Sequence, residues 1–485
     1  MKILFIDIDT LRPDHLGCYG YHRNTSPSID RIAADAIRFD QCYVPDAPCL
    51  PSRAALHFGR FGIHTGAINH AGRYADPHID NQQRGFQTNP NRRQLTHCIQ
   101  KAGYHTSTVS SFAGRHSAWW FLARFNDVFD CGRCGGELSS EVLDQALEYM
   151  DKYRNEENWY LHFNIWDPHT PYRVPEGYGN PFENDSIAGW VSQEMIDKHQ
   201  NSYGPHSANA VQHNPTAEPL PREVSQIRNL ADYKKWIDGY DVGIRHADDA
   251  IGRLLARLDE WGIYEQTAIV VTSDHGENQG ELNVYGDHQN ADLITNRVPM
   301  LVKWPGIPPR IDDRLHYQFD ITATMLRQLG CPIPEKWDAG PIADSLAETS
   351  TTGRDYLVVS QAAWSCQRAV IFDEYILIKT YADGLKEYPE LMLFHRFDDP
   401  HELHDLAGAK PDTVRRGLQL LQQWIDEQMD IADVKEDPML KVIQEGGPSH
   451  TRYRYQLLVD YYLSIDREDI AQKMIAKYQD NPLYH

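Results

Sequence analysis

One cysteine stands at a predicted helix start and is the first candidate for chemistry. Cys49 comes two residues before Pro51, which suits the first turn of a helix, and good helix formers follow at 54–56. Unpaired backbone N–H groups at such a terminus attract anions and lower the pKa of a thiol, an effect that Arg53 could reinforce. The alternative is a buried structural cysteine, because free Cys packs well as a small hydrophobic residue.

Polar side chains directly follow two predicted buried strands. Residues 3–8 form a continuous apolar run, typical of a parallel strand covered on both faces, and Asp9 comes next. The β-branched run 268–273 ends at Asp274 and His275. Because ligands in open α/β sheets bind beyond the carboxyl ends of strands, we expect these three side chains to form a divalent-cation site. The alternative for Asp9 is a carboxylate that caps the following turn.

Two further predicted strands lead to histidines. The apolar run 159–165 precedes His169, and nearby prolines fix the backbone on both sides of it, as suits a general acid. The alternative is a packed core histidine. The strand predicted at 106–110 is followed by Arg115 and His116, for which the alternative is a surface pair.

Length and charge limit the classes of partner. The chain has 485 residues, of which 41% are apolar, and a formal net charge of −22. It is long enough to bury a large core. Its negative field would repel polyanions, which excludes nucleic acid and anionic membranes as partners. Any anionic substrate must therefore be held by local cations.

The N-terminus and the cysteines bear on the compartment. The first strand-like run starts right after Met1 and Lys2, and we find no apolar run of about 18 residues or more, so we expect no signal peptide and no membrane span. This favours a cytoplasmic protein, although a start that replaces a removed leader would look the same. The eight cysteines are too scattered for a disulfide framework, and the pair Cys131 and Cys134 lacks the second pair of a zinc site.

The segment around Cys49 also resembles a family signature. Cys-Leu-Pro-Ser-Arg at 49–53, followed by a short helix and Gly-Arg, is similar to the signature of the type I sulfatases, within the alkaline-phosphatase-like superfamily. In that family the cysteine is oxidised to formylglycine, whose hydrated aldehyde is the nucleophile. The resemblance implies the same modification here and, as a partner, a formylglycine-generating or sulfatase-maturating enzyme. The usual Leu-Thr-Gly-Arg ending appears as His-Phe-Gly-Arg at 57–60.

Two more segments resemble the metal motifs of that family. Residues 9–20 are similar to the first motif, with Thr10 in place of a second Asp, and Ser-Asp-His-Gly-Glu at 273–277 is similar to the second. The resemblance implies a Ca²⁺-like hard cation, with Mg²⁺ or Mn²⁺ as alternatives. Its implied ligands are Asp9, Asp274, His275 and the modified Cys49 side chain. We expect Asp7 to point to the opposite face of its strand and to be structural.

The resemblance also implies that two histidines act on the substrate. Pro-His-Thr-Pro-Tyr at 168–172 closely resembles a family element whose histidine contacts the leaving-group oxygen. This implies that His169 protonates the departing alcohol or amine. His288, thirteen residues beyond His275, stands about where many sulfatases carry a substrate-binding lysine. We expect His288 to touch the substrate.

Arginines and one further histidine complete the implied site. Arg53 would stabilise the nucleophile. Phe-Ala-Gly-Arg-His at 112–116 resembles the Gly-Lys-x-His element of the family, with Arg115 in place of the lysine. Arg115 and His116 are therefore expected to bind the substrate. His116 is also the candidate base for the later step that expels sulfate and regenerates the aldehyde.

The fold class follows from the element order and the resemblance. We expect an α/β, alkaline-phosphatase-like fold with a large, mostly parallel sheet flanked by helices, plus a smaller C-terminal subdomain with a short antiparallel sheet. The predicted parts are a catalytic domain at 1–347 and a C-terminal subdomain with a helical tail at 348–485. The resemblance covers about 1–408. The remainder is expected to pack against a subunit of a homo-oligomer or over the active-site mouth.

Segments between the motifs have expected roles of their own. A helix is expected at 29–37, and a long amphipathic helix with Ile244 to Leu258 in its apolar stripe should pack in the core. The stretch 62–95 should be surface loop and is a candidate for the lining of a polar cleft. The polar stretch 175–230 is long for a loop in a compact domain, and we expect it to shape substrate specificity.

The combined motifs predict a hydrolase that uses a cation and a modified cysteine. The resemblance implies a sulfatase that cleaves a sulfate ester or a sulfamate. A cytoplasmic location favours a small sulfated carbohydrate, because polysaccharides cannot enter the cell. One alternative is a phosphonate monoester or phosphodiester hydrolase of the same superfamily, and another is a non-catalytic relative that binds anions or sugars.

Overall fold

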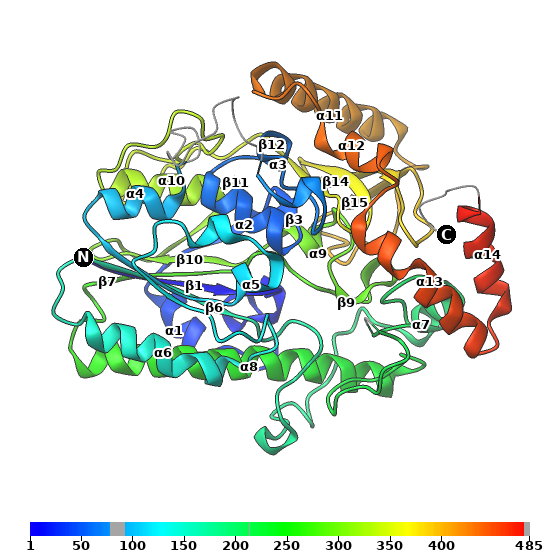
Figure 1. Cartoon of the computed structure of the whole chain (residues 1–485), viewed down its shortest axis with the longest axis horizontal. Helices are drawn as coiled ribbons and strands as arrows, with labels where there is room; N and C mark the ends of the chain where they lie inside the picture. The colour runs from blue at the N-terminus through cyan, green and yellow to red at the C-terminus, as the bar shows by residue number, and fades with distance from the viewer. Residues whose placement is uncertain (78–92, 213, 480–485) are drawn as a thin grey trace.

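An eight-stranded, mostly parallel sheet runs through the middle of the protein (Figure 1). The computed structural model describes residues 1–77, 93–212 and 214–479. The strands, in their order across this sheet, are β11 (Arg310–Tyr317), β2 (Ile37–Tyr43), β10 (Met300–Lys303), β7 (Thr267–Thr272), β1 (Lys2–Ile8), β6 (Trp159–Ile165), β4 (His105–Val109) and β5 (Asp127–Phe129). Only β10 runs antiparallel to its neighbours, so the expected mostly parallel sheet is confirmed.

Helices cover both faces of this sheet. The first face carries α2 (Cys49–Phe58), α4 (Leu95–Lys101) and α10 (Gln318–Gln328), and the second carries α1 (Pro27–Ala34), α6 (Ser139–Lys152) and α8 (Leu230–Glu260) (Figure 1). Successive side chains of a strand point to opposite faces. Ile3 and Phe5 of β1 accordingly join the first core, and Leu4, Ile6 and Ile8 join the second. Full burial of each such side chain contributes about 1.5–3 kcal/mol.

A second, smaller sheet is built mainly from the C-terminal part of the chain. Its antiparallel strands are β15 (Leu391–His395), β14 (Tyr375–Ala382), β13 (Cys366–Phe372) and β12 (Tyr356–Gln361). The edge strand β3 (Asp46–Ala47) comes from the N-terminal part and pairs with β12 in parallel. The helix α11 (Pro411–Ile431) contacts β13 and β14. The expected antiparallel sheet is thereby confirmed, with one N-terminal strand added.

Three further helices end the described chain: α12 (Pro438–Gln444), α13 (Ser449–Ser464) and α14 (Glu468–Tyr478). The last two lie beside α7 (Gln193–Gln200) at one side of the molecule (Figure 1). Tyr455 and Tyr462 of α13 share a hydrophobic cluster with Tyr203, and the Tyr461 hydroxyl donates to the Asn209 carbonyl over 2.7 Å. The C-terminal helices are thus packed on the polar stretch predicted at 175–230.

The long helix and the strands at 3–8, 159–165 and 268–273 are confirmed. The helix expected at 29–37 is α1, which ends at Ala34, three residues earlier than expected, because β2 begins at Ile37. The surface-loop prediction for 62–95 is wrong at α3 (Gly62–Thr65), which is buried, while 78–92 lie outside the described residues. In the described part of the chain, every helix is too short or too polar to span a bilayer. The domain boundary at 347/348 stays a prediction.

Candidate functional site

Two neighbouring strands and one helix bring the predicted metal ligands together. Strand β1 pairs with β7 in a parallel register that ends at Asp7 opposite Thr272, so Asp9 and Asp274 emerge side by side. Cys49 is the first residue of α2, whose Ser52 hydroxyl donates to the Asp274 carbonyl and joins the helix to the end of β7. We call four residues the carboxylate group: Asp9, Cys49, Asp274 and His275. One potential ligand atom from each of them lies within 4.8 Å of those of the other three.

Arg53 joins three carboxylates beneath this group. Its Nε donates to Asp7 over 2.8 Å, and its Nη1 donates to Asp9 over 3.1 Å and to Asp274 over 2.5 Å. All four side chains are buried. The expectation that Asp7 points away is wrong, because residues two apart in a strand face the same side. Asp7 therefore positions Arg53.

The charges of this buried group suit a divalent cation. Three carboxylates face one guanidinium, and the Asp9 Oδ1 atom is buried with no hydrogen-bond partner in the described structure. Burial and the nearby Asp274 raise the pKa of Asp9 well above its usual range. Oxygen-rich donors around such an excess of negative charge fit a hard cation such as Ca²⁺. The donor set therefore passes the chemical test for the implied metal.

Cys49 is a protonated thiol in this environment. Burial, together with Asp9 and Asp274, raises its pKa well above the ordinary value. The helix-terminus argument for a lowered pKa was therefore wrong. The Nδ1–H of His275 donates to the Gly276 carbonyl over 2.8 Å, which leaves Nε2 to accept from the thiol, 3.1 Å away. An uncharged thiol is a weak nucleophile, so the encoded side chain is poorly suited to attack an ester.

Cys49 lies in the wall of a cavity of about 490 Å³. Three other predicted site residues line it: Arg115, His169 and His288. The stretch predicted at 175–230 contributes several wall residues between Val211 and Glu223, including Gln212. The stretch 175–230 therefore reaches the cavity, while its expected effect on specificity stays a prediction.

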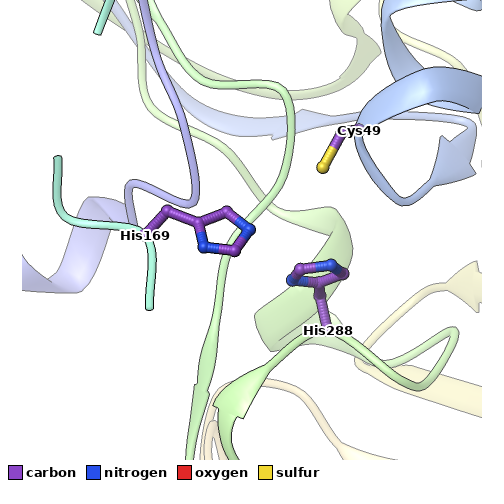
Figure 2. A group of neighbouring side chains, drawn as sticks. All are labelled: Cys49, His169 and His288. Carbon is purple, nitrogen blue, oxygen red and sulfur yellow. The ribbon is translucent and has the colours of Figure 1, made fainter. Parts of the chain in front are cut away.

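His169 and His288 face Cys49 across this space, and Figure 2 shows both rings turned toward the region beside the sulfur atom. The His169 Nδ1–H donates to the Thr170 carbonyl, so Nε2 carries the lone pair. Burial and Arg115 lower the pKa of His169 well below its usual value. His288, which follows β9 (Tyr285–Asp287), has a pKa lowered well below its usual value by burial and by His275. Both rings are therefore neutral in the free protein at neutral pH.

Arg115 and His116 differ in their access to the cavity. Both belong to the short helix α5 (Phe112–His116). The Arg115 guanidinium lies 4.7 Å from the Trp166 ring centre and lines the cavity. His70 lines the cavity, but His116 does not. The ring centres of His116 and His70 lie 4.8 Å apart. The structure thus brings Arg115 to the cavity and leaves His116 behind His70.

Another part of the cavity wall, which we call the outer wall, is formed by residues not individually predicted as site residues: His70, His206, Asp287, Trp364 and His450. The Trp364 and His450 rings are stacked with centres 4.6 Å apart, and His450 Nε2 lies 2.9 Å from His70 Nδ1. His450 belongs to α13, beyond the region of family resemblance. His70 and His206 lie in the stretches 62–95 and 175–230, and Asp287 is the direct neighbour of His288, whereas no sequence signal indicated Trp364 or His450.

The sequence of this chain is similar to those of known proteins. Iduronate 2-sulfatase from Homo sapiens is 26% identical over 345 residues, and the match covers 63% of this chain and 60% of that relative. The chain thus spans less than two thirds of the length of that relative.

Two solved structures share the fold. One, a protein in complex with its substrate D-glucosamine-2-N,6-O-disulfate, has a TM-score of 0.69 at 18% identity and covers 90% of this chain and 99% of its own. The other, a phosphonate monoester hydrolase from Silicibacter pomeroyi, has a TM-score of 0.68 at 19% identity and covers 90% and 96%. The sulfatase family model matches residues 2–331, and on that match the chain belongs to the sulfatase family of the alkaline-phosphatase-like superfamily.

Proposed function

We propose that this protein hydrolyses a sulfate ester, or a sulfamate, of a small carbohydrate. The observation that carries the proposal is the buried carboxylate group, which places Cys49 against two carboxylates and an imidazole at the wall of a cavity. Membership of the sulfatase family supports the same reaction. A neutral thiol is a weak nucleophile and does not account for ester hydrolysis. We therefore further propose that a maturation enzyme converts Cys49 to formylglycine.

The modified side chain and the cation have defined places in this proposal. A hydrated formylglycine at position 49 would supply two geminal hydroxyls, one to attack sulfur and one to allow later elimination of sulfate. Asp9, Asp274, His275 and the side chain at position 49 would hold Ca²⁺, with Mg²⁺ or Mn²⁺ as alternatives; the cation would polarise a sulfate oxygen. Arg53 balances part of the remaining negative charge of this buried group.

The histidines would handle the protons. His169 is the proposed general acid for the departing oxygen or nitrogen, and an anionic substrate beside it would raise its low pKa toward the working range. Arg115 and His288 line the cavity and are proposed to bind the sulfate group. His116 remains the proposed base of the later step, with its contact to His70 as a route for the proton.

A carbohydrate is favoured by the outer wall. Trp364 and His450 offer an aromatic face, while Asp287 and Gln212 offer groups that can bind hydroxyls. Iduronate 2-sulfatase and the relative solved with D-glucosamine-2-N,6-O-disulfate are named for sugar substrates. We propose a cytoplasmic protein and a small sulfated saccharide; a homo-oligomer remains a further proposal.

A second candidate function is phosphonate monoester or phosphodiester hydrolysis. A phosphonate monoester hydrolase shares the fold, and the proposed cation and modified cysteine would suit that reaction as well. Inert binding of anions or sugars is the third and weakest alternative, because the carboxylate group and Arg53 are in place.

The test begins with the mass of the peptide that contains Cys49, which reports formylglycine directly. The converted protein is then assayed with nitrophenyl sulfate, a phenylphosphonate monoester and a panel of sulfated monosaccharides. We expect the largest kcat/KM on a sulfated sugar. A much larger value on the phosphonate would replace the proposal with the second candidate. Inactivity of fully converted, metal-loaded protein on every compound would favour the binding alternative.

A further inference from the structure

Cys49 belongs to a second group of possible ligands, separate from the carboxylates. The Cys49 sulfur and one ring nitrogen each from His169 and His288 all lie within 4.8 Å of one another, and all three residues are buried. Figure 2 shows the three side chains, from three different segments, converging on one space. We call Cys49, His169 and His288 the thiol-imidazole group.

The two imidazoles are already oriented for a cation. The hydrogen bond from His169 Nδ1 to the Thr170 carbonyl fixes the tautomer and leaves Nε2 unprotonated. The Nδ1 atom of His288 is buried with no hydrogen-bond partner in the described parts of the chain, and its Nε2 lies 3.4 Å from Asp287. A backbone carbonyl or carboxylate behind a histidine is the usual support of a metal-binding imidazole.

The ligand chemistry of the two groups differs. A thiolate with two imidazoles suits Zn²⁺, which accepts three protein ligands and leaves a fourth position for water. Two carboxylates suit a hard cation instead. Since both groups share the side chain at position 49, the atom present there decides which group is complete: sulfur before conversion, oxygen after it.

We propose that the unconverted chain binds one Zn²⁺ through Cys49, His169 and His288. Binding forms a Zn–S bond, breaks the S–H bond and releases the proton to the buffer, with no change of oxidation state. Conversion of Cys49 removes the sulfur ligand and weakens the site. The proposal concerns the thiol form and holds whichever ester the converted protein cleaves.

The test uses full-length protein made without a maturation enzyme and shown by intact mass to retain the thiol at position 49. Ca²⁺ in excess keeps hard-cation sites occupied while Zn²⁺ is titrated against a chromogenic chelator. Co²⁺ then replaces Zn²⁺, because a cobalt-thiolate bond gives a charge-transfer absorption that a histidine-only site lacks. We expect one equivalent of Zn²⁺ and this absorption.

Variants assign the ligands. Cys49→Ala, His169→Asn and His288→Asn should each weaken Zn²⁺ binding at least about 10-fold, and Cys49→Ala should remove the cobalt-thiolate absorption. Cys134→Ser removes an exposed thiol and His404→Asn an exposed imidazole, and both should bind Zn²⁺ like the parent. Circular dichroism verifies that each variant is folded. If one histidine variant does not fold, the other still tests whether an imidazole of this group binds Zn²⁺.

Several results would overturn the proposal. One is Zn²⁺ affinity unchanged in the folded histidine variants, and another is cobalt absorption that persists in Cys49→Ala. Binding lost in Asp9→Asn but intact in His288→Asn would place the zinc among the carboxylates. Equal Zn²⁺ affinity of thiol and formylglycine forms would show that sulfur is not a ligand.

Discussion

The inner and outer parts of the cavity are held in different ways. At the inner end, Asp9, Asp274 and the side chain of Arg53 are tied by buried ion pairs that join two strand ends to α2. Much of the outer wall is held by contacts between rings of distant segments, as in Trp364, His450 and His70, and Asp287 lies 3.1 Å from the His206 ring. In the proposed reaction, the inner part would act on the ester group, whereas the outer part would meet the rest of the substrate.

Under the proposed function, this difference would separate reaction from recognition within one chain. Breaking an inner contact leaves a buried charge without its partner, which costs several kcal/mol. Losing an outer ring contact removes only about 0.5–1.5 kcal/mol. Variants of the inner part should therefore affect all substrates alike, and variants of the outer wall should affect larger substrates selectively.

The largest expected effect is that of Cys49→Ala. Loss of the nucleophile should reduce kcat on the order of 10⁶-fold for aryl and sugar sulfates alike. Because alanine fills nearly the same volume, the variant should still fold and unfold in one cooperative transition. Steady-state assays and thermal denaturation check both points. Substantial turnover by this variant would refute the mechanism and remove the basis for the comparison.

Removal of the cation comes next. Treatment with a chelator should abolish turnover of every substrate, because no cation would then polarise a sulfate oxygen. A cation present at 100 times its Kd stabilises the fold by about 2.7 kcal/mol, so the melting temperature should fall as well. Both effects should reverse when Ca²⁺ is added. Full activity of protein shown by elemental analysis to be metal-free would contradict the assignment.

His169→Asn should separate substrates by their leaving groups. General acids contribute about 10²–10⁴-fold, which a sugar ester should lose, while nitrophenyl sulfate needs little protonation and should lose much less. The pKa of His169 is lowered by burial and Arg115, so its acidic form is scarce at neutral pH. kcat/KM on sugar esters should therefore rise as pH falls below neutrality. A pH profile unchanged in the variant would argue against this acid.

The smallest expected effect belongs to the outer wall. His450→Ala removes the ring stacked on Trp364 and should raise KM for a sugar sulfate about 2- to 10-fold, with kcat and the nitrophenyl sulfate reaction nearly unchanged. Tyr453→Ala is the matched control, since Tyr453 lies on the same helix and is 72% exposed. An equal loss of kcat/KM on the sugar sulfate and on nitrophenyl sulfate would contradict the proposed difference between the inner and outer parts.

The inner part was largely predictable from the sequence. Buried parallel strands are continuous apolar runs, and a polar residue at the end of each, such as Asp9 or Asp274, must emerge at the same edge of the sheet. Local reasoning still failed for the pKa of Cys49. A helix start lowers a thiol pKa only weakly, whereas burial and two carboxylates from other strands raise it.

The outer wall could not be predicted in this way. His70 and His450 are 380 positions apart, and each occupies a stretch without strong periodicity or a known motif. Their contact depends on how α13 packs on the segment around Tyr203, which is a property of the complete fold. The stretch 175–230 was recognised only by its length and polarity, which indicated a role but identified no wall residue.

The strand β3 ends two residues before Cys49 and pairs with Ser360 and Gln361 of the second sheet. Cys49, the proposed nucleophilic position, therefore lies between the two sheets: α2 packs on the large sheet, and the chain that leads into α2 pairs with the small one. A chimaera that exchanged the C-terminal part for that of a relative would have to preserve this two-residue pairing. Under the proposed function, exchanging the outer wall alone would change substrate selectivity, while exchanging β12 as well would weaken the support of the side chain at position 49.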